Sequence, residues 1–127
     1  MKGRSISAGK ASGPALVSRS PLGFYGGVDP LTGVVVERGH ELEGRSVTGA
    51  VLVFPNAKGS TVGSYVIYAL ARNGTGPVAI VNSETETIVA AGAILAGIPC
   101  VDRIDVSTIE EGEILEVDAD EGTVQRG

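Results

Sequence analysis

The sequence predicts an α/β fold in which parallel strands alternate with helices. Three apolar runs rich in Val, Ile and Ala, at 50–54, 78–82 and 98–102, are typical of buried strands. The two segments between them have apolar residues at helical spacing. Glycines, 19 in all, separate these segments and indicate tight turns rather than disorder. Because each connection contains a helix, we expect the three strands to be parallel and to form a βαβαβ unit.

Composition supports one globular domain spanning 1–127 and excludes several classes of protein. Apolar residues make up 43% and aromatic residues only 4%, so the core must consist of aliphatic side chains. The net charge is −5 and the basic residues are scattered, which argues against nucleic-acid binding. No apolar stretch is long enough to cross a bilayer, and the first residues lead into no signal peptide. We therefore expect a cytoplasmic protein that does not bind a membrane.

The first part of the chain predicts short strands and loops. Strands are expected at 2–8 and 13–18, with a glycine-containing turn between them, and at 34–37 after a turn. The glycine-rich loop 22–30 could close on a neighbour or be an ordinary turn. The segment from 38 to 49 is polar and predicts irregular structure. It contains the only histidine, His40, which we interpret as a surface residue.

The middle and the end of the chain give clearer signals. After strand 50–54, a helix is expected over 60–72 and a stop at Asn73-Gly74, where Arg72 faces the negative helix end. Strand 78–82 leads to a capping box at 83–86, and a second helix runs to about Ala96. Apolar residues nearly encircle this helix, so we expect it to be buried on more than one side. Strand 98–102 completes the unit, and 113–118 with 123–126 predict a hairpin.

The junction between strand 50–54 and helix 60–72 is the strongest candidate site. Ligands bind beyond the carboxyl ends of parallel strands, where this loop and the loop 82–85 both lie. Lys58 brings a positive charge, Ser60 and Thr61 bring hydroxyls, and the small Gly59 allows close approach to the backbone. With the backbone N–H groups of a helix start, these residues favour an anion. The alternative is that Ser60 only caps the helix and that Lys58 is a solvated loop residue.

Other motifs are weaker candidates. The lysine precedes the glycine at 58–59, which is the wrong order for a P-loop. Cys100 is the only cysteine and follows an apolar run, so we interpret it as an inert core thiol. The tail acids lack the spacing of a calcium loop, and no metal site is predicted. Glu84 and Glu86 are interpreted as residues that cap the second helix rather than as substrate ligands.

Residues 58–66 resemble the signature of the small subunit of the aconitase X group. The similarity extends in the same order to 13–17, 26–29, 82–88 and 97–99, and thus covers most of the chain. One departure is Asn56-Ala57, where relatives often carry a glycine pair. The resemblance implies a swivelling three-layer β/β/α domain, like the mobile domain of aconitases. It also implies that this domain closes over a large subunit, which would hold an iron–sulfur cluster and most substrate contacts, while this chain binds no cofactor.

The resemblance further implies an activity. The complex would be a hydro-lyase that dehydrates (R)-5-phosphomevalonate to trans-anhydromevalonate 5-phosphate, in an isoprenoid pathway. Ser60 would be the catalytic base, with Ser64 as the second candidate. Lys58, Gly59 and Thr61 would contact the phosphorylated hydroxy acid.

Three alternatives stay open. Relatives in the same group resemble dehydratases of cis-3-hydroxyproline, and this chain alone does not identify the substrate. A phosphohistidine or ligand-binding module on the same swivelling fold is the second alternative, and the phosphohistidine form would need a histidine on a glycine-rich turn beside the active face. His40, however, lies outside the βαβαβ unit. A purely structural subunit is the third alternative.

Overall fold

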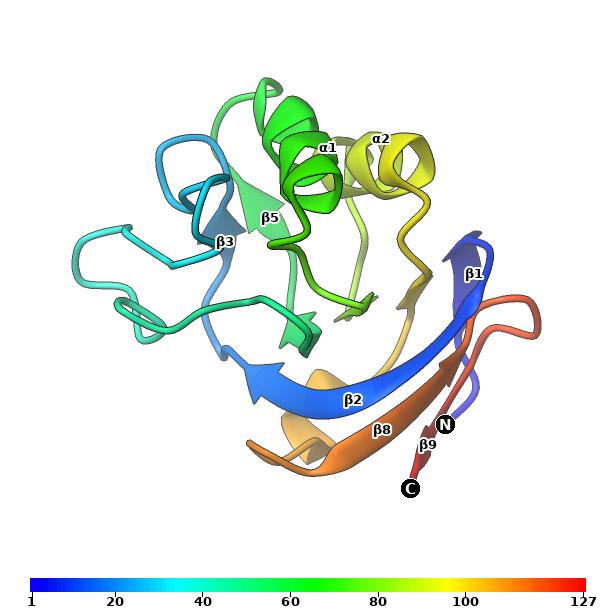
Figure 1. Ribbon diagram of the computed structural model, residues 1–127. Coiled ribbons are helices and arrows are strands. Elements are labelled where there is room, and N and C mark those ends of the chain that lie inside the picture. Colours follow the sequence, from blue (N-terminus) through cyan, green and yellow to red (C-terminus); the bar gives the residue numbers. More distant parts are fainter.

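The computed structural model describes all 127 residues and shows an α/β fold in three layers (Figure 1). A seven-stranded sheet has the strand order β1-β7-β6-β4-β2-β8-β9. The helices α1 and α2 cover one face of its middle part, and neither is long and apolar enough to cross a membrane. The elements of the sheet and its helices are β1 (Arg4–Ser7), β2 (Lys10–Val17), β4 (Val51–Phe54), α1 (Gly63–Asn73), β6 (Ala79–Asn82), α2 (Thr87–Ala96), β7 (Cys100–Asp102), β8 (Ile114–Asp118) and β9 (Thr123–Arg126).

The predicted βαβαβ unit forms the centre of the sheet. Strands β4, β6 and β7 are parallel neighbours, and β2 is parallel to β4 on the other side. The carboxyl ends of β4 and β6 therefore lie at one edge, where both candidate loops begin. The predicted hairpin of β8 and β9 is also confirmed, and β1 joins the opposite edge antiparallel to β7.

Strand β2 connects two layers of the molecule. Its first half, Lys10 to Pro14, pairs with β8, and its second half, Ala15 to Val17, pairs with β4. The sheet therefore curls, and β8 and β9 pass beneath its middle (Figure 1). Alternate residues of the central strands enter two separate cores. Leu52 packs toward the helices and Val51 toward β8 and β9, so the β/β/α layering is confirmed.

Two local predictions are wrong, and two short elements were not predicted. Strand β2 begins at Lys10 rather than at 13, directly after Gly9, whose φ is +131°. The strand at 34–37 is absent, and only isolated bridges join its first residues to Val28 and Ser46. The short β3 (Leu22–Gly23) and β5 (Ala57–Lys58) form an unpredicted parallel pair. The 3₁₀ helix η1 (Val106–Thr108) was also not predicted.

The ends of α1 follow only part of the prediction. The helix begins at Gly63 rather than at 60, and the preceding residues form a turn. It ends as predicted, because Gly74 adopts a left-handed conformation with φ +71° and Arg72 lies in the last turn. Residues 60–62, predicted as the start of the helix, therefore belong to the loop that carries the candidate site.

Helix α2 departs from the prediction in its cap and its burial. Its N-cap is Glu86, whose carboxylate accepts the Ile88 N–H at 2.9 Å, so the capping box with Ser83 is wrong. One face is buried against α1 and the sheet, but Ile94 and Leu95 are 60% and 58% exposed. Burial on more than one side is therefore wrong for this chain. Gly97 ends the helix as predicted.

Candidate functional site

The loop between β4 and α1 leaves the carboxyl edge of the sheet and carries the predicted site. After Phe54 the chain turns at Pro55 and adds the short strand β5. Gly59 then has φ +91°, a conformation that favours glycine and reverses the chain in front of the helix. Gly59, Ser60 and Thr61 are all exposed, so the loop presents its backbone and its hydroxyls to the outside.

Ser60 lies one turn before the helix. Its Oγ accepts the Val62 N–H at 3.2 Å, and its carbonyl accepts the Gly63 N–H at 2.9 Å. The next two N–H groups, of Ser64 and Tyr65, are likewise bonded within this turn. The first three amides of α1 are therefore not available to a ligand, contrary to our expectation. The backbone N–H groups at 59–61, earlier in the loop, have no hydrogen-bond acceptor.

The two candidate serines face different surroundings. Ser64 is buried, and its Oγ donates to the Thr61 carbonyl at 3.0 Å. Its backbone carbonyl lies where α1 packs against Gly92 of α2. Ser60 is exposed, and its hydroxyl proton has no acceptor. Of the two, only Ser60 offers a free hydroxyl to a ligand.

Lys58 is not a free loop lysine. Its Nζ lies 2.7 Å from Glu37 Oε2, and the other oxygen of Glu37 accepts the Gly23 N–H at 3.3 Å. Burial alone would raise the pKa of Glu37, but the hydrogen bonds from Lys58 and Gly23 outweigh burial and leave this pKa below its ordinary value. Sequence reasoning missed Glu37, because it placed this residue at the end of a strand that does not form. The only signal was a charged residue directly after an apolar run.

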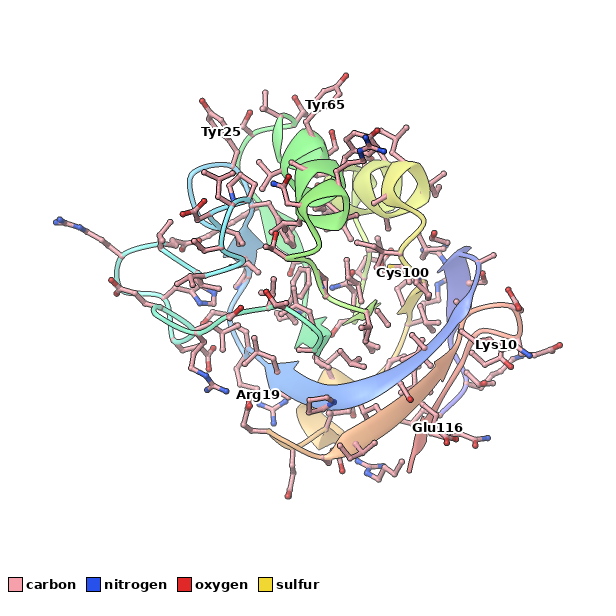
Figure 2. The ribbon with its side chains drawn as sticks, viewed as in Figure 1. Lys10, Arg19, Tyr25, Tyr65, Cys100 and Glu116 are labelled. Atoms are coloured by element: carbon pink, nitrogen blue, oxygen red, sulfur yellow. The ribbon has the colours of Figure 1, made fainter.

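The glycine-rich loop beside this ion pair contains a hydrogen-bonded turn. The N–H groups of Gly27 and Val28 both donate to the Phe24 carbonyl. A Cβ on Gly27 would lie 1.8 Å from the Gly23 carbonyl, so only glycine closes this turn. Figure 2 shows Tyr25 of this loop and Tyr65 of α1 at the same end of the molecule. The turn therefore borders the candidate site.

A buried polar network holds the second loop at this edge of the sheet. Asn82 donates from its side chain to the Phe54 carbonyl at 2.9 Å and accepts the Thr85 hydroxyl at 2.9 Å. Asp102 accepts the Thr85 N–H and is held by Arg4 through two hydrogen bonds of 2.8 and 3.0 Å. Burial raises the pKa of Asp102, but the bonds from Arg4 and Thr85 outweigh it and leave the pKa below its usual value. Three strand ends are thus tied together by residues that sequence reasoning did not select.

The two glutamates of this loop separate. Glu86 caps α2 as predicted, whereas Glu84 is exposed and lies 3.9 Å from Arg4 without capping the helix. Neither carboxylate has a hydrogen bond to the loop that carries Ser60, but the backbone N–H of Glu84 donates to the Pro55 carbonyl of that loop at 3.2 Å.

The chain offers no donor set for a metal or a cluster. No group of three His, Cys, Asp or Glu side chains comes together. Cys100 is buried, as predicted, and burial raises the pKa of its thiol to about 12, so it is not a thiolate at neutral pH. These residues do not fit an iron–sulfur cluster.

His40 is buried, so its interpretation as a surface residue is wrong. Its Nε2 lies 3.0 Å from the Pro21 carbonyl, and its Nδ1 accepts the Leu42 N–H at 3.0 Å. Nε2 holds the irregular segment to the residue before β3, and Nδ1 accepts a bond from within the segment, so both ring nitrogens are engaged. His40 thus has a structural role, and neither nitrogen is free for phosphoryl transfer.

Comparisons with known proteins agree over nearly the whole chain. The family model described as the aconitase X swivel domain matches residues 1–126. A phosphomevalonate dehydratase small subunit from Thermococcus sibiricus is 59% identical, with 98% of this chain and 95% of the relative covered. A protein of the same name from Methanocella arvoryzae is 53% identical, with 98% and 97% covered. The crystal structure of Thermococcus kodakaraensis aconitase X, in its holo-form, is 55% identical, with a TM-score of 0.98 and with 99% and 96% of the two chains covered.

Proposed function

The chain belongs to the aconitase X swivel-domain family, and from this premise we propose that it forms a hydro-lyase with a large subunit and supplies Ser60 as the catalytic base. The complex dehydrates (R)-5-phosphomevalonate to trans-anhydromevalonate 5-phosphate, in an isoprenoid pathway. Relatives at 52–59% identity carry the name phosphomevalonate dehydratase small subunit, which supports this substrate over cis-3-hydroxyproline. The observation that carries the role of Ser60 is its exposed hydroxyl, whose proton has no acceptor.

A serine that takes a proton from carbon must first exist as an alkoxide, which is unfavourable at neutral pH. The Val62 N–H already points at Ser60 Oγ at 3.2 Å. Lys58 is two residues away and adds a positive charge to the same loop. When a partner covers this exposed loop, water is excluded and these interactions strengthen. The loop therefore has the donors that a serine base requires.

The substrate brings negative charges, and the same loop can receive one of them. The backbone N–H groups of Gly59 and Thr61 have no hydrogen-bond acceptor, and the ammonium of Lys58 contacts only the Glu37 carboxylate, which leaves it further N–H donors. We assign the anionic contact to these three residues and the proton transfer to Ser60. This division between binding residues and base is consistent with the chemistry, because the anionic group and the carbon that loses its proton are different parts of the substrate.

The iron–sulfur cluster is assigned to the large subunit, since this chain has no donors that fit one. Bound there, the cluster would act as a Lewis acid toward the departing hydroxyl. This chain would contribute the proton acceptor, the anion contacts and the cover that excludes water. A phosphohistidine role receives no support, because His40 is buried with both ring nitrogens engaged.

The test compares two serines in the complex purified with its large subunit. Ser60→Ala is expected to assemble normally and to lower kcat on phosphomevalonate by about 10²–10⁴-fold, the usual contribution of a positioned base. Ser64→Ala is the matched control, since it removes one buried hydrogen bond and no exposed hydroxyl. Full activity of Ser60→Ala, or loss of activity only in Ser64→Ala, would reject the assignment. Activity of the wild-type complex on cis-3-hydroxyproline alone would reject the substrate.

A further inference from the structure

Glu37 is a charged residue with no role in the function proposed above. It lies in the irregular segment before α1, far along the chain from Lys58, yet its carboxylate is in direct contact with the Lys58 ammonium at 2.7 Å. The side chain of Glu37 is 23% exposed and that of Lys58 is 52% exposed. The carboxylate therefore lies on the inner side of the pair and the ammonium on the side that faces the solvent.

The carboxylate is itself held by the backbone. Gly23 donates its N–H to Glu37 Oε1 at 3.3 Å, and Gly23 pairs with Lys58 in the small parallel sheet of β3 and β5. The backbone N–H of Glu37 donates to the Gly27 carbonyl at 3.2 Å. Lys58 is thus held at two points: its backbone pairs with Gly23, and its ammonium contacts Glu37, which is itself bonded to Gly23.

This geometry changes what Lys58 can do. A lysine side chain has four flexible carbons and loses rotamer entropy when a ligand immobilises it. In this molecule Glu37 has already fixed the ammonium, so a ligand would not have to do so. An ammonium has three N–H donors, and the contact with Oε2 uses one of them. The remaining donors are available to an anion on the exposed side.

We propose that Glu37 is a positioning residue, which holds the Lys58 ammonium ready for an anionic group of the substrate. The inference rests on the proposed function, since it takes Lys58 to be a substrate contact. Glu37 does not touch the substrate and acts only through Lys58.

The experiment measures kcat and KM for the assembled complex on phosphomevalonate with three variants. Glu37→Gln keeps an acceptor for Gly23 but removes the charge, and we expect KM to rise about tenfold with kcat little changed, the pattern of a lost binding contact. Lys58→Met should raise KM further. Glu37→Gln added to Lys58→Met should then have no additional effect, because its action passes through the ammonium. Glu43→Gln is the matched control, since Glu43 is an exposed glutamate of the same segment whose carboxylate accepts a hydrogen bond from the Gly39 N–H and none from a lysine.

The exchanged pair Glu37→Lys with Lys58→Glu separates positioning from a merely structural ion pair. The exchange restores opposite charges, and thermal unfolding of the complex shows whether the variant is folded. The proposal predicts a folded complex with KM raised as in Lys58→Met, because the ammonium is now on the wrong residue. A normal KM in the exchanged pair, or a lower KM in Glu37→Gln, would overturn it.

The Ser60→Ala variant, assayed under the same conditions, distinguishes a failure of the Glu37 proposal from a failure of the serine-base proposal. Loss of kcat in Ser60→Ala with unchanged KM in Glu37→Gln would overturn the role of Glu37 alone. Retained kcat in Ser60→Ala with raised KM in Glu37→Gln would overturn the base and support Glu37.

Discussion

Single residues decide which groups face the candidate site. Ser60 and Ser64 lie four residues apart, yet one hydroxyl is exposed and the other is bonded inside the molecule. Lys58 is fixed by a glutamate whose contact no spacing rule could predict. The same holds for Asp102, which is fully buried and holds the loop after β6 through the Thr85 N–H. The contacts of Lys58 and Asp102 join parts of the chain that are distant in sequence, so they follow from the fold and not from local sequence.

At this scale Asp102→Asn tests the buried network. The change keeps the shape but removes the charge that holds Arg4, and an amide cannot accept all three hydrogen bonds. We expect the free energy of unfolding to fall by about 2 kcal/mol, as when a buried charged hydrogen bond loses a partner. Chemical denaturation at pH 7 measures the effect. Glu84→Gln, at the exposed and more distant contact of Arg4, is the control and should change stability little.

The same carboxyl predicts a dependence on pH. Its pKa in the folded protein is below the ordinary value, so folding is favoured by the ionised form. This stabilisation is complete above about pH 4, the ordinary pKa of Asp, and is lost as the pH falls through the lower folded value. Denaturation curves of wild type between about pH 5 and pH 2 should therefore decline more steeply than those of Asp102→Asn. Parallel curves would show that Asp102 does not contribute to acid unfolding.

Whole elements position the site through the packing of α1 on α2. Gly92 of α2 lies against Ile67 and the Ser64 carbonyl of α1, and a Cβ there would meet the side chain of Ile67 at 2.9 Å. The two helices can approach this closely only because residue 92 has no side chain. The start of α1, and with it the loop that carries Ser60, depends on this contact.

Gly92→Ala is expected to destabilise the protein even though alanine is the better helix former. Overpacking costs about 1–3 kcal/mol, against a gain of up to about 1 kcal/mol in helix propensity. We therefore expect a net loss of about 1 kcal/mol, together with a lower kcat, because α1 must shift. Ala91→Gly, on the exposed side of the same helix, isolates the propensity term. An increase in the stability of Gly92→Ala would show that the contact between the helices is looser than described.

Prediction from the sequence was most accurate for elements with strong periodicity. The βαβαβ unit, its parallel order, the helix stops at Gly74 and Gly97 and the final hairpin are all confirmed. The start of α1 was placed three residues early, because Ser60 has the chemistry of a helix cap but bonds within the preceding turn. The pair of β3 and β5 was missed, because each strand has only two residues and no periodic signal.

The whole molecule is organised by the double pairing of β2. This strand belongs to the parallel centre and to the antiparallel layer below it, so one curled sheet encloses a second core (Figure 1). The layering was predicted from the resemblance and not from periodicity, since no local pattern shows where a strand changes partners. The loops that follow β4 and β6 therefore lie together at one edge of the curled sheet.

The central claim is that Ser60 removes a proton from the substrate, and hydrogen exchange with solvent measures this step directly. The complex of this chain with its large subunit is incubated with phosphomevalonate in D₂O, and deuterium in the recovered substrate is followed. Wild type should incorporate deuterium at the carbon that loses its proton. Ser60→Ala should bind the substrate with unchanged affinity and incorporate none. Exchange in Ser60→Ala at the wild-type rate would contradict the account.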